Sequence, residues 1–292
     1  MPSTVTVKVP ATSANLGPGF DCLGLALDLW GTITLSTSEG GGERDPMATM
    51  AVTAARLVYE KLGEETPPLF AYYEGDIPIA RGLGASAIAR AGAVVAADAL
   101  IGDKLAPDDL LAIAASLEGH TDNAAPAIFG GFQVTVSEGD VISRVSVPLP
   151  RGLSAVLFVP ELRMPTRESR KLLPESLPRA DVVHNSSRTA LLVAAIASGR
   201  FDVLNAATQD KLHQPARSTL FPAMFSIFDA ARDAGAHGAY LSGGGSTICA
   251  LASDNLRGIA DAMQHAATER DTPGQTIITK PTAKGAIVVE TS

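Results

Sequence analysis

A glycine-rich segment that leads into an alanine-rich stretch is the first part of the chain with clear chemical potential. It reads Arg81-Gly82-Leu83-Gly84-Ala85-Ser86-Ala87, and helix-favouring residues continue to Leu100. Glycines let backbone amides approach a ligand, and the first amides of a helix are unpaired donors at its positive end. The segment therefore predicts a phosphate-binding loop, in which the Ser86 hydroxyl caps the helix or binds Mg²⁺ held by the same phosphates. A simple glycine turn at the start of a helix is the alternative.

Four polar side chains that can bind metal ions gather in a second segment. Glu118, His120, Asp122 and Asn123 fall within six positions, and the run from 124 to 131 that follows is almost wholly apolar. Glutamate, aspartate and histidine are ligands with hard or borderline preferences. The cluster indicates either a metal site or a site for Mg²⁺ together with a substrate. A polar turn between a helix and a strand is the third interpretation.

A second glycine run lies near the C-terminal end of the chain. It reads Ser242-Gly243-Gly244-Gly245-Ser246-Thr247 between two apolar stretches. Ordering three consecutive glycines costs roughly 0.5–1 kcal/mol each relative to alanine, so a fold keeps them where side chains would collide with something close. The run predicts either a ligand loop or a tight connection between strands.

Known nucleotide-binding motifs narrow the choice of fold. The Walker A string Gly-x-x-x-x-Gly-Lys-Ser/Thr does not occur, which excludes a P-loop fold. Residues 82–87 match the relaxed dinucleotide fingerprint Gly-x-Gly-x-x-Ala, with Asp103 about twenty residues further on. However, Asp76 and Pro78 precede the motif where a buried central strand should run. This context argues against dinucleotide binding.

The composition excludes several classes of function. The chain has 292 residues and a formal net charge of −8, with 46 % hydrophobic and 18 % charged residues, which is ordinary for a compact globular protein. The acidic balance argues against nucleic acid or an anionic membrane as the main partner. We expect no secretory signal and no membrane span, which would need about 18 consecutive apolar residues. Two cysteines, Cys22 and Cys249, predict reduced thiols in a cytoplasmic protein.

The spacing of apolar residues and breakers predicts strands and helices in two halves. In the first half we expect strands at 4–9, 31–37, 69–73, 132–136 and 141–147 and helices at 48–62, 85–100 and 107–117. A break rich in proline and glycine between Pro148 and Gly152 places a domain boundary near residue 150, giving domains 1–150 and 151–292. In the second half we expect strands at 154–159 and 239–241 and helices at 180–198, 201–211, 221–234 and 255–267.

Three segments together match one known family. The first is Ser13-Ala14-Asn15-Leu16-Gly17-Pro18-Gly19-Phe20-Asp21, the second combines residues 81–87 with 118–131, and the third is the stretch 241–251. With further matches at 166–170, 185–192 and 212–217, the chain resembles the GHMP small-molecule kinases, and among them the homoserine kinases most closely. In that family residues 81–87 correspond to the ATP-phosphate loop. The resemblance spans nearly the whole chain.

The resemblance implies a fold, a reaction and cofactors. The fold is α+β with two domains: an N-terminal domain like ribosomal protein S5 domain 2, which binds ATP, and a ferredoxin-like C-terminal domain, which closes the substrate site. The implied reaction transfers the γ-phosphoryl group of ATP to the side-chain hydroxyl of L-homoserine in threonine biosynthesis. ATP and Mg²⁺ are the implied cofactors, and related kinases suggest a homodimer. A GHMP kinase for another small alcohol and a non-catalytic ligand sensor on the same fold are the alternatives.

The resemblance also implies roles for individual residues. The predicted phosphate contacts are Arg81, Gly82, Leu83, Gly84, Ala85, Ser86 and Ala87, and the predicted Mg²⁺ ligands are Ser86 and Glu118. The predicted catalytic residues are Asn15, Asp122 and Asn123. The predicted substrate contacts are Asn15, Asp21, Asp122, Thr166, Arg170, Arg217 and Gly244.

Homoserine is a zwitterion, and its site needs groups for both charges. Arg170 and Arg217 are expected to take the carboxylate, because a bidentate guanidinium has the right shape for it. Asp21 and Asp122 are expected to face the ammonium group. Phosphoryl transfer depends mostly on positioning and charge neutralisation, so we expect direct in-line transfer without a strong base. His120, His213 and Thr166 are second-rank candidates that organise the loops.

Overall fold

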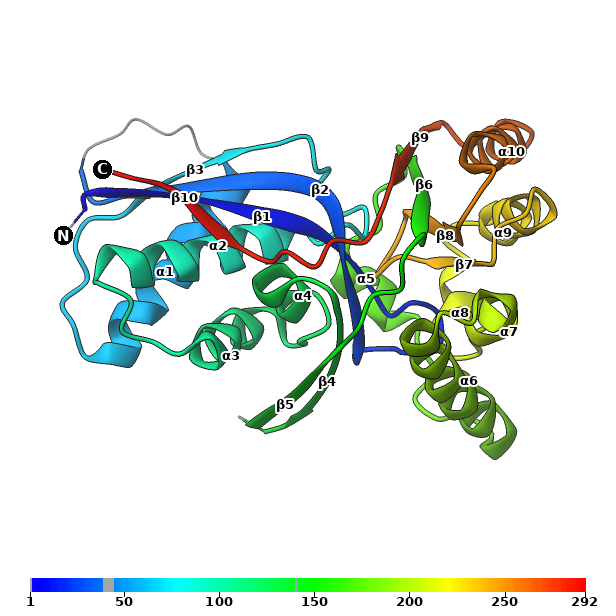
Figure 1. The fold of residues 1–292 in the computed structure, drawn as a ribbon, viewed down its shortest axis with the longest axis horizontal. Coiled ribbons are helices and arrows are strands. Elements are labelled where there is room, and N and C mark those ends of the chain that lie inside the picture. Colours follow the sequence, from blue (N-terminus) through cyan, green and yellow to red (C-terminus); the bar gives the residue numbers. More distant parts are fainter. Residues whose placement is uncertain (1, 39–44, 140) are drawn as a thin grey trace.

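The computed structural model describes residues 2–38, 45–139 and 141–292, and this part of the chain forms two antiparallel sheets (Figure 1). The first sheet has the order β10-β1-β2-β4-β5, with β3 paired to β2 off this path. Its strands are β1 (Thr4–Ala14), β2 (Leu23–Ser36), β3 (Phe70–Glu74), β4 (Phe132–Glu138), β5 (Val141–Val147) and β10 (Ile287–Thr291). The second sheet has the order β7-β8-β6-β9. Its strands are β6 (Ser154–Pro160), β7 (Gly238–Leu241), β8 (Ile248–Ala252) and β9 (Gly274–Thr279).

Helices α1 (Pro46–Leu62), α2 (Ala85–Leu100), α3 (Pro107–Glu118) and α4 (Ala124–Phe129) lie on one side of the first sheet (Figure 1). Helix α2 packs directly on β1 and β2. It can come this close because its inward positions carry alanine and glycine: a Cβ on Gly92 would lie 2.8 Å from the Ile33 side chain. Close packing of α2 fixes the position of its N-terminus, and thus of the glycine-rich segment before it.

The second sheet carries helices on the side away from the first sheet. Helices α9 (Met224–Asp233) and α10 (Leu256–Thr268) pack on its strands around a separate apolar core that includes Phe158, Met224, Ile248 and Met263. The other helices of this half are α5 (Thr166–Lys171), α6 (Arg179–Ser198), α7 (Leu204–Ala207) and α8 (Gln214–Arg217). Helix α5 lies between the two sheets in Figure 1. This half therefore presents the short helix α5 toward the first sheet.

The end of the chain returns to the first sheet. After β9, the Asp28 amide donates to the Lys280 carbonyl, and β10 then pairs antiparallel with β1. The Ser3 amide donates to the Ser292 carbonyl at 2.6 Å, which places the two ends of the chain side by side (Figure 1). The domain boundary near residue 150 stays a prediction, but the structure adds that the last strand belongs to the sheet of the first half.

Most predicted elements are confirmed, and the exceptions have physical reasons. Helix 85–100 and the hairpin of β4 and β5 match the prediction closely. The predicted strand 31–37 covers only the end of β2, because residues 23–27 are buried on both faces and show no alternation. The predicted helix 201–211 is wrong: a 3-10 turn and α7 end at Ala207, and the Asp210 carboxylate then accepts three backbone N–H groups, which holds a turn instead of a helix.

Candidate active site

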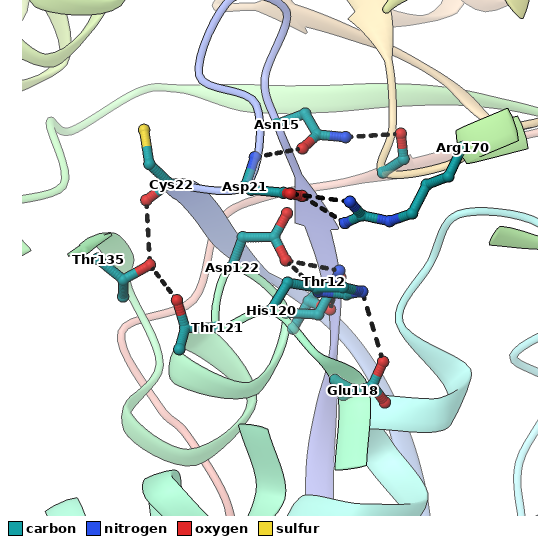
Figure 2. A network of polar contacts seen from close by, with 12 residues as sticks. Thr12, Asn15, Asp21, Cys22, Glu118, His120, Thr121, Asp122, Thr135 and Arg170 are labelled. Carbon is teal, nitrogen blue, oxygen red and sulfur yellow. Dashed lines mark hydrogen bonds and ion pairs between the residues drawn. The ribbon is translucent and has the colours of Figure 1, made fainter. Parts of the chain in front are cut away.

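The loop between β1 and β2 enters the second half of the molecule through residues with left-handed backbone. Asn15, Gly17 and Asp21 have φ values of 68°, 85° and 58°. A Cβ on Gly17 would lie 2.2 Å from the Thr208 carbonyl oxygen, so only glycine fits there. The Asn15 Oδ1 accepts the Asp21 amide at 3.0 Å, which fixes the loop from within (Figure 2).

The glycine-rich segment 81–84 lies against both β1 and the second glycine run. The Thr12 amide donates to the Leu83 carbonyl at 3.2 Å, and the Ser242 hydroxyl donates to the Gly82 carbonyl at 2.6 Å. Gly82 and Gly84 have φ values of +77° and +68°. A Cβ on Gly82 would lie 2.1 Å from the Ser242 carbonyl oxygen, and a Cβ on Gly84 would lie 1.9 Å from the Thr12 Oγ1. Both positions therefore require glycine.

The N-terminus of α2 follows Gly84 and keeps its donors free. Within the described residues, the amides of Ala85, Ser86 and Ala87 donate to no protein acceptor. The N-cap position of α2 is Gly84, which has no side chain that could accept a capping hydrogen bond, and both predicted functions of the Ser86 hydroxyl stay predictions. Free amides at a helix N-terminus attract phosphate, which supports the predicted phosphate loop.

The Arg81 side chain forms hydrogen bonds to backbone carbonyls of the second half of the chain. Its Nε donates to the Pro160 carbonyl at 2.8 Å and its terminal nitrogen to the Glu161 carbonyl at 2.5 Å. Burial, together with the charge of Arg163, lowers the pKa of this guanidinium. The side chain thus ties the glycine-rich segment to the end of β6, and a contact between this guanidinium and phosphate stays a prediction.

The polar cluster after α3 is organised by His120 (Figure 2). The Asp122 Oδ1 lies 2.7 Å from its Nδ1, and the Glu118 Oε2 lies 3.8 Å from its Nε2. Burial lowers the pKa of His120, but the hydrogen bond to Asp122 and the charges of both carboxylates outweigh it, so the pKa is raised overall. Glu118 also forms an ion pair with Arg90 of α2. Over residues 2–38, 45–139 and 141–292, no group of three or more histidine, cysteine or acidic side chains is arranged so that it could hold a metal ion. This finding argues against the interpretation that the cluster is a metal site made of protein ligands alone.

Asn123 and Thr121 connect the cluster to neighbouring strands. The Asn123 Oδ1 accepts the Thr12 hydroxyl of β1 at 2.8 Å. The Thr121 hydroxyl donates to Thr135 of β4 at 2.6 Å, and Thr135 contacts the Cys22 carbonyl at 3.3 Å. These bonds bring residues 118–123 to the N-terminus of α2, next to the glycine-rich segment.

Arg170 faces this cluster from α5 and forms a bidentate pair with Asp21, with N–O distances of 2.9 and 2.5 Å (Figure 2). Burial lowers the pKa of Arg170, but the hydrogen bond and charge of Asp21 and the charge of Asp122 raise it overall. The guanidinium also lies 5.1 Å from the Phe20 ring centroid. Arg170 therefore has its counter-charge within the protein.

Arg217 of α8 is buried and has no such counter-charge. It is 1 % exposed, and no carboxylate of the described residues lies within 4.0 Å of it. One terminal nitrogen donates to the Gly243 carbonyl and to His213 Nδ1, each at 2.9 Å, while its Nε has no hydrogen-bond partner in the described part of the chain. Burial and the nearby Arg170 charge lower its pKa to about 10, against opposing effects of the Asp21, Asp210 and Asp122 charges. A buried cation of this kind needs an anion.

The second glycine run closes the site from the other side. The Gly243 carbonyl accepts the Asn15 Nδ2 at 2.8 Å as well as Arg217. A Cβ on Gly244 would lie 3.6 Å from the Thr166 Oγ1. The structure thus brings the predicted substrate residues of the N-terminal loop, α5, α8 and the glycine run together. Thr12, Phe20 and Gly243 were not among the predicted site residues, although each lies within or beside a matched motif.

Comparisons with known proteins agree with this geometry. Residues 49–131 match the model of the GHMP kinases N terminal domain, and residues 192–268 match that of the GHMP kinases C terminal domain. The homoserine kinase of Moorella thermoacetica is 40 % identical over 97 % of this chain and 99 % of its own length. The homoserine kinase of Symbiobacterium thermophilum is 45 % identical over 75 % of this chain and 74 % of its own. This chain belongs to the homoserine kinase branch of the GHMP kinase family.

Solved structures support the same assignment. The crystal structure of homoserine kinase from Cytophaga hutchinsonii superposes with a TM-score of 0.89 at 28 % identity, covering 99 % of this chain and 98 % of that one. A mevalonate diphosphate decarboxylase from Staphylococcus aureus, at 15 % identity and a TM-score of 0.74, shares the fold alone. The predicted two-domain α+β fold is therefore confirmed. Among the helices that the structure describes, none combines the length and apolar character needed to cross a membrane.

Proposed function

We propose that this chain is an ATP-dependent kinase that phosphorylates the side-chain hydroxyl of L-homoserine, giving O-phospho-L-homoserine in threonine biosynthesis. The relatives named homoserine kinase support this reaction. The structural observation that carries it is the buried Arg217, whose guanidinium has no carboxylate partner among the described residues. A substrate carboxylate supplies the missing negative charge.

The Asp21–Arg170 pair explains how the other end of a zwitterion is bound. In the structure these two side chains neutralise each other. An amino acid that brings both a carboxylate and an ammonium group can exchange with this pair: its ammonium contacts Asp21, and its carboxylate contacts Arg170 together with Arg217. Asp122, which is buried and lies close to Asp21 in Figure 2, adds a second acidic group on the ammonium side. The site therefore favours a substrate with both charges.

ATP is bound by the glycine-rich segment and the free amides of α2, with Asn15 and Asn123 near the acceptor hydroxyl. We propose Ser86 and Glu118 as the Mg²⁺ ligands. Their donor set fits, because hydroxyl and carboxylate oxygens are the ligands that Mg²⁺ prefers, and Ser86 lies in the first turn of α2 beside the free amides. When bound, Mg²⁺ neutralises charge on the phosphates.

The chain's own residues contribute positioning more than proton transfer. In the reaction the homoserine hydroxyl oxygen bonds to the γ-phosphorus, the bond to the bridging oxygen of ADP breaks, and the hydroxyl proton is released to solvent. The Asp122 carboxylate is already engaged by His120 at 2.7 Å and faces the ammonium side in our proposal. We therefore propose in-line transfer without a dedicated protein base, with Asn15 and Asn123 orienting the hydroxyl.

The alternatives differ in substrate charge and in activity. Mevalonate carries a carboxylate but no ammonium group, so Asp21 and Asp122 would repel it. A ligand sensor would bind without turnover. Release of ADP, measured with L-homoserine, L-threonine, L-serine and mevalonate, separates these possibilities. We expect the highest kcat/KM with L-homoserine; activity confined to mevalonate, or no ADP release with any alcohol, would refute the proposal.

A pair of variants tests the observation that carries the proposal. Arg217→Met keeps an unbranched side chain in place of the arginine stem and removes the charge, so the homoserine KM should rise by about 100-fold or more. Arg232→Met is the matched control, because Arg232 pairs with Asp229 near the end of α9, and the kinetics of this variant should not change.

A cytoplasmic location and a homodimer stay predictions.

A further inference from the structure

His213 is a fully buried histidine that connects two parts of the substrate site. Its side chain is 0 % exposed. One ring nitrogen, Nε2, lies 2.7 Å from the Gly17 carbonyl oxygen in the loop after β1, and the other, Nδ1, lies 2.9 Å from a terminal nitrogen of Arg217. His213 thus joins the loop that carries Asn15 and Asp21 to the helix that carries the unpaired arginine.

These two partners fix the chemical form of the ring. A carbonyl oxygen can only accept, so Nε2 must carry a proton and donate to Gly17. A guanidinium can only donate, so Nδ1 must present its lone pair to Arg217. His213 is therefore neutral and in the Nε2–H form. Burial lowers its pKa to about 4 against an opposing effect of Asp210, and the charge of Arg217 lowers it further, which agrees with this assignment.

The ring is held in place from several sides. The backbone amide of His213 donates to Asp210 at 2.8 Å, and the Asn185 Nδ2 donates to the same carboxylate at 2.6 Å. The Phe20 ring lies against the imidazole, with 5.5 Å between centroids, and Phe20 also faces the guanidinium of Arg217. Because its own position is fixed, the imidazole can fix the positions of the groups that it contacts.

We propose that His213 is a positioning residue for homoserine, whose neutral imidazole holds the carboxylate-binding Arg217 at a set distance from the loop that binds the ammonium group. The two charged ends of the substrate are then bound by parts of the chain that lie about 200 positions apart in sequence. The contact between residues 17 and 213 joins positions that are 196 residues apart. This inference rests on the proposed function, because it assigns Arg217 and Asp21 to the two ends of the zwitterion.

Two amide substitutions separate the two contacts of the imidazole. In His213→Asn, the side-chain Oδ1 lies near the former Nδ1 and can accept from Arg217, but nothing reaches Gly17. In His213→Gln, the side-chain Nε2 lies near the former ring Nε2 and can donate to Gly17, while its Oε1 does not reproduce the Nδ1 acceptor. His213→Ala removes both contacts. His265→Asn is the control, because His265 is exposed on α10.

Steady-state kinetics with L-homoserine and ATP give the test. We expect the homoserine KM to rise about 10- to 100-fold in His213→Ala and in His213→Gln, which leave the buried Arg217 nitrogen without its acceptor. It should rise several-fold less in His213→Asn. The KM for ATP should stay within about twofold of wild type in all variants, since the phosphate loop keeps its own contacts. A residue that only stabilised the fold would not separate the Asn from the Gln variant in this way.

The outcomes are distinct. A wild-type protein that phosphorylates none of the amino-acid alcohols refutes the proposed function and, with it, this inference. An active wild type whose Asn and Gln variants share one homoserine KM overturns the inference alone. If His213→Ala does not fold, the comparison of Asn with Gln still decides the question, with thermal unfolding of both and of His265→Asn as the check on stability.

Discussion

Replacing Gly84 by alanine should disable the phosphate loop through a single contact. In the structure a Cβ at this position would lie 1.9 Å from the Thr12 Oγ1, whereas carbon and oxygen normally approach to about 3.3–3.6 Å. Either the Thr12 hydroxyl must move by about 1.5 Å, which breaks its hydrogen bond to Asn123, or the start of α2 must shift by that distance. Displacement of about 1 Å in a reacting site can cost about 100-fold in rate, so we expect kcat/KM for ATP to fall by about 100-fold or more.

Gly63 provides the matched control for backbone strain. Its φ of +67° is nearly the same as the +68° of Gly84, but no atom lies within 4 Å of its Cβ position, at the exposed end of α1. Alanine in this conformation costs roughly 1–2 kcal/mol in either place. Urea unfolding should show a loss of that size for Gly63→Ala, while its kcat/KM for ATP stays unchanged.

A second substitution tests whether the contact is the cause. In Gly84→Ala combined with Thr12→Ala, the hydroxyl is gone, and the nearest remaining atoms are the Thr12 Cβ at 3.2 Å and the Asn123 Oδ1 at 3.3 Å. The double variant should regain at least about tenfold in kcat/KM for ATP over Gly84→Ala, as measured by coupled ADP release. Thr12→Ala alone shows the cost of losing the hydrogen bond to Asn123. Equal kinetics for Gly84→Ala and Gly63→Ala, or no recovery in the double variant, would refute the reasoning.

Three further predictions concern charge and protonation. Asp122→Asn should mainly raise the homoserine KM, because in our proposal this carboxylate faces the substrate ammonium; a loss confined to kcat would contradict that role. Removal of divalent cations with EDTA should abolish activity and added Mg²⁺ restore it, and Glu118→Gln should raise the Mg²⁺ concentration for half-maximal rate by about tenfold or more. The free energy of unfolding should fall as the pH drops from 6.5 toward 4. The folded state holds the pKa of His213 at about 4, against an ordinary 6.5. The unfolded chain therefore binds more protons than the folded one in this pH window. Urea unfolding at pH 7 and 5 should show a smaller loss in His213→Asn, by at most about 2 kcal/mol; equal losses would show that His213 is not neutral in the fold.

The sequence by itself determined those features of the protein that depend on residues close together in the chain, such as a helix or a glycine turn. Alanine-rich 85–100 forms the predicted helix because its propensity and its packing agree. The glycines at 82 and 84 were predicted to let backbone approach a ligand, and the structure shows why only glycine fits. The motif around Asn15 and Asp21 predicted a substrate loop, although its left-handed backbone is visible only in the structure.

Tertiary structure decided which charges meet, because these contacts join residues far apart in the chain. Asp21 pairs with Arg170, 149 positions away, and nothing in the sequence shows that Arg217 stays without a carboxylate in the described part of the chain. The return of β10 to β1 and the end of the predicted helix 201–211 at Asp210 are likewise set by distant partners. Propensity and spacing act over a few residues, whereas burial, desolvation and ion pairing depend on the whole fold. The sequence thus named the groups that we propose as substrate contacts, and only the packing of the two sheets determined which of their charges lack a partner in contact within the described residues.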